Sequence, residues 1–134
     1  MNNKKIGTAF EKVVCETLAQ MGYWVHFIVP DARGAQPFDI IAVKNGKAYA
    51  IDCKTCAGGR LTFNRLEFNQ ICAFEKWIKC GNEMPVIVAE YNGNAYCVRY
   101  DVLKTQKSVK FGGVKGEKEN LRDLFYYHID VFFG

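Results

Sequence analysis

Asp39 and Asp52 are the residues whose spacing most clearly indicates chemistry, because each lies in an apolar stretch on one side of Asn45-Gly46. Asn-Gly between two such stretches is the strongest short signal for a β-hairpin with a two-residue turn. Such a turn fixes the register, and counting outward along both strands places Asp39 opposite Asp52. Side chains in that relation have Cβ atoms about 4.5–5.5 Å apart, where like charges repel. The pair therefore needs a cation, or one carboxyl group must hold a proton.

Lys54 adds a positive charge to this predicted pair. It lies two residues after Asp52, so the two side chains project from the same face of a strand. A few carboxylate oxygens, with room for water and phosphate oxygens, form the kind of site that Mg²⁺ prefers. A lysine beside such a site stabilises negative charge or orients an attacking water. In the alternative interpretation the register is shifted or the hairpin edge is exposed, and all three residues are ordinary solvated charges.

A first helix, predicted at residues 6–21, carries Glu11. Its apolar residues repeat at helical spacing, and Gly22 follows where a helix is expected to stop. Glu11 shares the apolar face of this helix, so it can reach over the edge of the sheet toward the same site. The alternative is a glutamate at the boundary of the core that extends into water.

A second helix is predicted from Asn64 to about Cys80, with Glu67 completing a capping box and Gly81 ending the helix. Gln70 belongs to the apolar face of this helix, so its amide is expected to point inward. It either contributes to the site or is a core amide whose hydrogen bonds are satisfied.

The remaining chain is expected to complete one α/β domain over residues 1–134. Residues 104–118 hold five lysines, one glutamate and three glycines, and are predicted to be a mobile basic loop. Residues 121–133 are expected to form a short terminal helix or strand. The order of helix, three strands, helix and two strands predicts a central mixed β-sheet flanked by helices. The predicted strands are residues 23–29, 38–43, 47–55, 85–91 and 95–100, the last two joined at Asn92-Gly93.

Composition limits the class of protein. The 134 residues are 49% hydrophobic and 24% charged, which excludes a disordered tail, a collagen-like chain and a low-complexity scaffold. The net charge of +4 permits an anionic partner without requiring one. The N-terminus lacks the apolar segment of a secretory signal, and no stretch is long enough to cross a membrane. We therefore expect a cytoplasmic protein without a membrane partner.

The six cysteines are expected to be reduced in that compartment and to act mostly as small buried apolar residues. Cys53-x-x-Cys56, taken with Cys72 and Cys80, offers a zinc or iron–sulfur site as an alternative. Against it, Cys53 faces away from Asp52 along the strand, and the later spacing is irregular. No phosphate-binding P-loop pattern is present, so no nucleotide cofactor is expected.

Together these residues resemble the PD-(D/E)XK nuclease superfamily: Glu11 on a helix, Pro37-Phe38-Asp39 opening a strand, and Asp52-Cys53-Lys54 ending the next. The Asp-x-Lys element matches literally, whereas Phe38 is inserted into the Pro-Asp element. Gln70 matches a position where several members carry glutamine. The resemblance covers about residues 6–100 and is strongest to small Holliday junction resolvases of the archaeal and RecU types. Stand-alone VRR-type nucleases are a close alternative.

This resemblance implies a restriction-endonuclease-like core and an endonuclease that hydrolyses phosphodiester bonds in branched DNA, such as four-way junctions. The implied cofactor is Mg²⁺, for which Mn²⁺ substitutes, and the implied assembly is a homodimer. Lys54 would position the attacking water and offset negative charge, while Gln70 would orient the water or Lys54. A catalytically silent DNA-binding module of the same fold is the remaining alternative. The implied metal ligands are three carboxylates and one backbone carbonyl: Glu11, Asp39, Asp52 and Cys53.

Basic residues supply the other nucleic-acid signal. Each of them taken alone is also explained as a solvated surface charge. The lysines of residues 104–118 form either a DNA-contacting arm or a soluble loop. Five further residues lie in predicted loops or at helix starts near the site, where phosphate contacts would position DNA: Lys4, Lys5, Arg33, Arg60 and Arg65.

Overall fold

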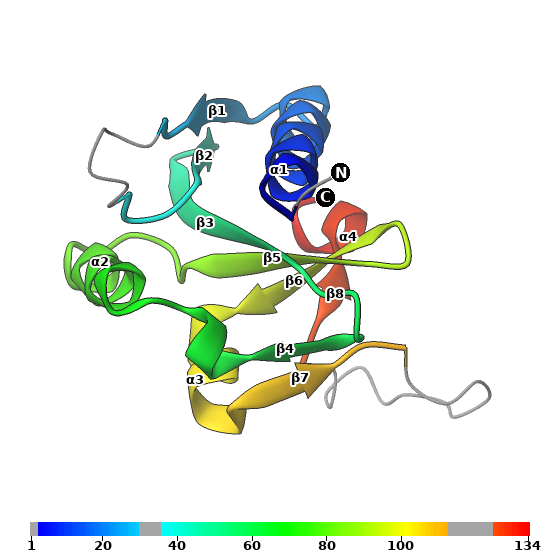
Figure 1. The fold of residues 1–134 in the computed structure, drawn as a ribbon. Helices are drawn as coiled ribbons and strands as arrows, with labels where there is room; N and C mark the ends of the chain where they lie inside the picture. The colour runs from blue at the N-terminus through cyan, green and yellow to red at the C-terminus, as the bar shows by residue number, and fades with distance from the viewer. Residues whose placement is uncertain (1–2, 30–35, 113–124) are drawn as a thin grey trace.

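A computed structural model describes residues 3–29, 36–112 and 125–134 of the chain. A mixed sheet lies at its centre, with helices on both faces (Figure 1). Within the described residues, every helix is too short or too polar to cross a membrane. The elements in chain order are α1 (Asn3–Gln20), β1 (Trp24–Phe27), β2 (Ile40–Lys44), β3 (Lys47–Thr55), β4 (Arg60–Thr62), the 3-10 helix η1 (Phe63–Arg65), α2 (Phe68–Lys79), β5 (Val86–Tyr91), β6 (Asn94–Arg99), α3 (Tyr100–Gln106), β7 (Ser108–Lys110), β8 (Tyr127–His128) and α4 (Ile129–Phe132).

The central sheet has six strands in the order β1-β2-β3-β5-β6-β8. β3 and β5 run parallel, and every other neighbouring pair is antiparallel. β4 and β7 form a separate two-stranded antiparallel sheet (Figure 1). The predicted central mixed sheet flanked by helices is therefore confirmed, although the second sheet is not among the predicted strands.

Both predicted hairpins are present, and the turns explain the register. Asn45 and Asn92 have φ values of 53° and 49°, and the glycine that follows each has a φ of 76°. Positive φ at both central residues belongs to the type I′ turn, whose twist matches that of the flanking strands. The β2–β3 ladder continues from the turn, pair by pair, to Ile40 opposite Ile51. The register predicted for the first hairpin is therefore confirmed along the whole ladder.

Each face of the sheet buries its own apolar core. α1 and α4 cover one face, where Val14, Leu18 and Phe133 pack with Ile51 of β3. We call this cluster the α1-side core. α2, α3 and the β4–β7 sheet cover the other face and form the α2-side core. Because successive strand residues face opposite sides, Asp52 is directed toward α2 when Ile51 is directed toward α1.

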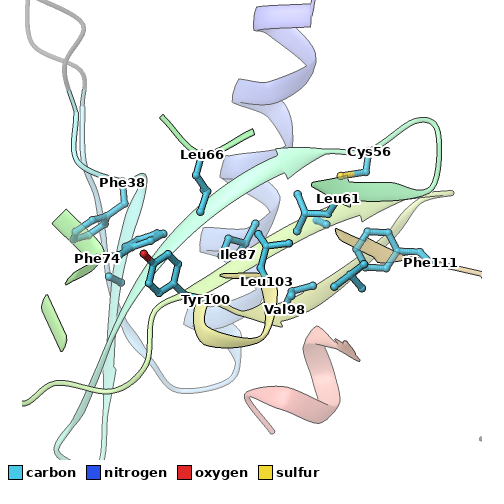
Figure 2. Packing of buried hydrophobic residues seen from close by; sticks show 13 residues of the cluster. Phe38, Cys56, Leu61, Leu66, Phe74, Ile87, Val98, Tyr100, Leu103 and Phe111 are labelled. Carbon is cyan, nitrogen blue, oxygen red and sulfur yellow. The ribbon is translucent and has the colours of Figure 1, made fainter. Parts of the chain in front are cut away.

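The α2-side core is built around stacked and edge-on aromatic rings (Figure 2). Phe38, Phe74 and Tyr100 lie together at one end of this core, and Phe111 lies at the other end. The Phe74 ring centroid is 6.0 Å from that of Phe38 and 5.2 Å from that of Tyr100. Phe38 immediately precedes Asp39, so this packing also anchors the segment that carries one of the two aspartates.

α2 lies in the connection between the parallel neighbours β3 and β5. A parallel pair cannot be joined by a tight turn, so the chain crosses one face of the sheet through β4, η1 and α2 before it returns to β5. This crossover brings the first turn of α2 beside β3, where Gln70 contacts Asp52. The topology thus positions a helix start next to the buried aspartate.

The start of α2 differs from the prediction. The helix begins at Phe68 with Glu67 as its N-cap, and Asn64 lies inside η1. The Gln70 side-chain oxygen accepts a hydrogen bond from the backbone N–H of Glu67 at 3.0 Å. The capping pair is therefore Glu67 with Gln70, because Gln70 satisfies a helix-start N–H and contacts Asp52 with the same amide.

The prediction of a mobile basic loop at residues 104–118 is wrong for its first part, residues 104–110. Residues up to Gln106 belong to α3, and β7 follows and pairs with β4. Leu103, Val109 and Phe111 are buried in the α2-side core, whereas the lysines between them are exposed. Burial of these apolar residues orders the segment. Residues 113–118 of the predicted loop lie outside the described residues, and the predicted terminal element is present as β8 and α4.

Replacement of Phe74 by alanine is expected to lower the free energy of unfolding by about 3–5 kcal/mol. The Phe74 ring is fully buried and packs against Phe38 and Tyr100. Phe68 lies on the same helix but is 81% exposed, so Phe68→Ala should change that free energy by less than about 0.5 kcal/mol. Urea unfolding followed by tryptophan fluorescence measures both variants. Equal losses in the two would contradict this packing.

Candidate active site

Asp39 and Asp52 meet at the end of the β2–β3 ladder. Asp39 directly precedes β2, and its backbone N–H donates to the Ile51 carbonyl at 3.0 Å. Asp39 Oδ2 accepts a hydrogen bond from the backbone N–H of Cys53 at 2.7 Å. Asp39 is 4% exposed and Asp52 is 1% exposed. The hairpin register therefore brings two carboxyl groups into one buried site.

Asp52 has two partners on the α2 side of the sheet. Gln70 Nε2 donates to Asp52 Oδ1 at 2.9 Å, and Lys54 Nζ lies 3.0 Å from Asp52 Oδ2. Lys54 Nζ also donates to Gln70 Oε1 at 3.4 Å. Apart from the ion pair with Lys54, no described group donates a hydrogen bond to the buried Asp52 Oδ2. One oxygen of the most buried carboxylate is thus left for a further partner.

Glu11 of α1 lies within electrostatic range of Asp39 and Lys54. Partial burial, followed by the charge of Asp39, raises the pKa of Glu11 to about 7, and Lys54 opposes this shift in part. Burial, followed by the charge of Asp39, likewise raises the pKa of Asp52 above its ordinary value. Three carboxyl groups therefore crowd around one lysine. Without a further cation, full ionisation of all three at neutral pH is unfavourable.

The side-chain amides of Gln36 and Asn69 complete the cluster, and little in the sequence marks either residue as part of a site. Gln36 Nε2 donates to Asp39 Oδ1, and the Gln36 backbone carbonyl accepts from Asn69 Nδ2 at 2.9 Å. Asn69 precedes Gln70 in the first turn of α2, and its position next to that glutamine is the signal that could have identified it. Gln36 lies in irregular chain before β2, where no periodic pattern marks a residue as important.

The donor set determines what this cluster can bind. Among the described residues, no three His, Cys, Asp or Glu side chains are placed to hold a metal ion as they stand. The chemistry nevertheless fits a divalent cation, because the donors are carboxylate oxygens of the kind that Mg²⁺ prefers. Gln36 Oε1 is also buried without a hydrogen-bond partner among the described groups, and Asp52 Oδ2 has the Lys54 ion pair as its described partner. A cation would offset the burial and the charge of Asp39, which together raise the pKa of Glu11.

The predicted DNA-contacting residues fall into two groups. Arg65 is exposed at the end of η1, and its guanidinium donates to the Thr55 carbonyl at 2.8 Å, one residue beyond Lys54. Arg60 is exposed at the start of β4, directly opposite Lys110 of β7. The other three lie outside the description: the side chains of Lys4 and Lys5, whose backbone belongs to α1, and the whole of Arg33.

Cys53 and Cys56 pack on opposite faces of the sheet, which contradicts a metal site built on this Cys-x-x-Cys pair. Cys53 belongs to the α1-side core and Cys56 to the α2-side core. Cys72 and Cys80 are exposed, on α2 and at its end. Burial raises the pKa of the Cys53 thiol well above its ordinary value, so this group is neutral in the fold. Only its backbone takes part in the cluster, and a role for its carbonyl stays a prediction.

A separate hollow of about 250 Å³ lies at the turn end of the β2–β3 hairpin. Tyr23, Lys44, Tyr49 and Phe133 are among the residues that line it. No side-chain carboxylate lines this hollow, and it lies at the opposite end of the hairpin from Asp52. The chemistry-bearing groups are therefore concentrated at the carboxylate cluster.

Comparison with known proteins identifies a family and similar solved structures. A sequence model described as archaeal Holliday junction resolvase (hjc) matches residues 2–128, while no curated protein matches the chain. The fold is similar to the 1.6 Å resolution structure of Archaeoglobus fulgidus Hjc, a Holliday junction resolvase from an archaeal hyperthermophile. That match has 14% identity and a TM-score of 0.61, and it covers 77% of this chain and 85% of the other. At this identity, the likeness shows a shared fold.

In the presence of a chelator, the free energy of unfolding is expected to fall as the pH rises from about 5 to about 8. Glu11 and Asp52 have raised pKa values in the fold, so the folded chain holds protons that the unfolded chain releases near pH 4. The stability linked to these protons is present at low pH and is lost as the pH rises through the folded pKa values. Urea unfolding at a series of pH values measures the slope.

Asp52→Asn should flatten this pH dependence, because it removes one of the two groups with raised pKa values. Asp101→Asn is the matched control, since Asp101 is exposed and pairs with Arg99 at the surface. A slope that is unchanged in Asp52→Asn would show that the carboxylate cluster does not cause it.

Proposed function

Because this family model covers most of the chain, the protein belongs to the archaeal Holliday junction resolvase family, and we propose that it cuts four-way DNA junctions with the help of a divalent metal ion. Membership makes it a Holliday junction resolving nuclease of DNA recombination and repair. Membership also favours a resolvase over the VRR-type alternative. The metal, the site residues and the homodimer are the parts that we add as proposals.

The crowding of Glu11, Asp39 and Asp52 beside Lys54 carries the metal proposal. Repelling carboxylates are costly to bury, and they are retained where a cation offsets their charge. The three would hold Mg²⁺, or Mn²⁺ in its place, with the Cys53 carbonyl as a further ligand. A bound Mg²⁺ supplies Lewis-acid stabilisation of the phosphoryl oxygens and acidifies a coordinated water.

Lys54 and Gln70 supply the positioning that phosphodiester hydrolysis requires. Lys54 Nζ is held between Asp52 Oδ2 and Gln70 Oε1, so its charge stays at one place in the site. From there it orients the attacking water and offsets negative charge that develops on the phosphate. Gln70 donates to Asp52 through Nε2 and accepts from Lys54 through Oε1. It thereby fixes the Asp52 carboxylate relative to the Lys54 ammonium group.

The β4–β7 sheet and η1 offer charges to the DNA backbone. Arg60 and Lys110 are direct cross-strand neighbours of like charge, an arrangement that costs stability unless an anion lies between them. Within the described part of the chain, no carboxylate forms an ion pair with Arg60, Arg65 or Lys110. We assign these three to phosphate contacts. A homodimer would place two such sites on a junction whose paired strands are cut symmetrically.

Asp52→Asn is expected to reduce Mg²⁺-dependent junction cleavage by more than about 100-fold, because loss of a ligand costs more than loss of an outer partner. Junction binding measured in chelator should survive, since the surface arginines are unchanged. Single-turnover cleavage and a gel-shift titration measure the two quantities. Asp101→Asn serves as the control and should cut at the rate of the unaltered chain. Full cleavage by Asp52→Asn would overturn the site assignment.

The same assay on four-way, splayed, nicked and linear DNA tests the substrate. We expect preferential cleavage of the four-way junction with Mg²⁺ and none with chelator. Equal cleavage of every substrate would indicate a general nuclease. Binding to junctions without cleavage in either ion condition would indicate a catalytically silent module.

Arg60→Ala is expected to weaken junction binding about equally for all sequences and to reduce the slope of log K against log salt by about 1. The reason is the loss of one phosphate contact. Arg99→Ala is the matched control, because the Arg99 guanidinium is already paired with Asp101. Fluorescence anisotropy at several salt concentrations measures both slopes, and equal slopes in Arg60→Ala and Arg99→Ala would remove Arg60 from the interface.

A further inference from the structure

We infer that Gln36 and Asn69 are positioning residues that tie the Asp39 carboxylate to the first turn of α2, and so hold Asp39 and Asp52 at a fixed separation. This inference rests on the metal-dependent function proposed above and names two residues that determine how well the cluster takes a divalent cation. Neither residue would touch the ion or the DNA in this role.

The first step concerns the two hydrogen bonds that orient the Asp39 carboxylate. Its Oδ1 accepts from Gln36 Nε2, and its Oδ2 accepts from the backbone N–H of Cys53. An ionised carboxylate has about four lone-pair sites, so two protein donors orient the group and leave lone pairs free for a cation. Cys53 fixes one oxygen through β3, and Gln36 fixes the other through a side chain.

The second step connects Gln36 to α2. Asn69 Nδ2 donates to the Gln36 backbone carbonyl, and the next residue, Gln70, donates to Asp52 Oδ1. Consecutive residues of one helical turn therefore reach both aspartates, Gln70 directly and Asn69 through Gln36. The Gln70 oxygen also accepts from the Glu67 N–H, which anchors this turn at the helix start. The separation of the two carboxylates is thereby coupled to a rigid element.

The third step concerns the free-energy cost of burying the unpaired side-chain oxygen of Gln36. Its Oε1 is buried and has no hydrogen-bond partner among the described groups. A buried unpaired amide oxygen is unfavourable, and an apolar side chain of the same size would avoid it. Glutamine at this position is therefore explained by its N–H group, which orients Asp39. Partners that orient ligating carboxylates are worth about 10–100-fold in metal affinity or activity.

The test compares Gln36→Met, Asn69→Ala and the double variant with the unaltered chain. Methionine keeps the length of the side chain but lacks the N–H donor. The matched control is Asn82→Ala, because Asn82 donates its side-chain amide to the Trp77 carbonyl near the other end of α2. Three quantities are measured: the Mg²⁺ concentration for half-maximal single-turnover cleavage, Ca²⁺ binding by calorimetry in the absence of DNA, and the free energy of unfolding in chelator.

We expect Gln36→Met to raise the half-maximal Mg²⁺ concentration and to weaken Ca²⁺ binding, each by about 10-fold or more. Asn69→Ala should act in the same direction, and the double variant should be no worse than Gln36→Met, since the two contacts act in series. Asn82→Ala should leave both ion measurements unchanged.

Unchanged ion dependence in Gln36→Met and Asn69→Ala, with or without loss of stability, would overturn the inference and leave the proposed function intact. Additive effects in the double variant would overturn the serial link. If the unaltered chain neither cuts with Mg²⁺ nor binds Ca²⁺, the proposed metal-dependent function itself fails.

Discussion

Burial of the Asp52 carboxylate is the constraint on which the arrangement around it depends. With 1% of its surface exposed, this group cannot rely on water, and a buried carboxylate is stable only with partners or a proton. β3 supplies Lys54, and α2 supplies Gln70. The chain before β2 adds Asp39, a group of the same charge, at close range. A buried polar cluster thus joins strand, helix start and loop on the α2 side of the sheet, and it carries more carboxylates than cations.

The hairpin is the part of the site that the sequence predicts best. Asn45-Gly46 is compatible with few turn types, and a turn of known length transmits its register as far as Ile40, the residue after Asp39. Gln70 is more difficult, because Asn64 and Glu67 both look like helix caps in a local pattern. The contact between Gln70 and Asp52 is long-range, and no local pattern contains it. The contacts of Gln36 depend in addition on an irregular segment, whose conformation no periodicity specifies.

The second sheet shows how composition can conceal order. Lysines at 104, 107 and 110 dominate the segment in any count of charge, yet the neighbouring Leu103 and Val109 are buried. A fold is maintained by which positions are apolar, and charged residues can occupy the intervening positions freely. The same reasoning explains how this chain shares a fold with Archaeoglobus fulgidus Hjc at 14% identity and a TM-score of 0.61. Identity of residues is required only where chemistry or a special backbone angle demands it.

The parallel pairing of β3 with β5 has a consequence for how the protein matures. These strands become neighbours only after the chain has completed its excursion through β4, η1 and α2, and such non-local closure is slow compared with hairpin formation. Glu11 must also be brought in from α1, since the groups that act on it, Asp39 and Lys54, lie before β2 and on β3. A partly folded chain that has formed only the β2–β3 hairpin therefore lacks Glu11 and Gln70 at the proposed site. The proposed site is therefore complete only once α2 has packed beside β3 and Gln70 has reached Asp52.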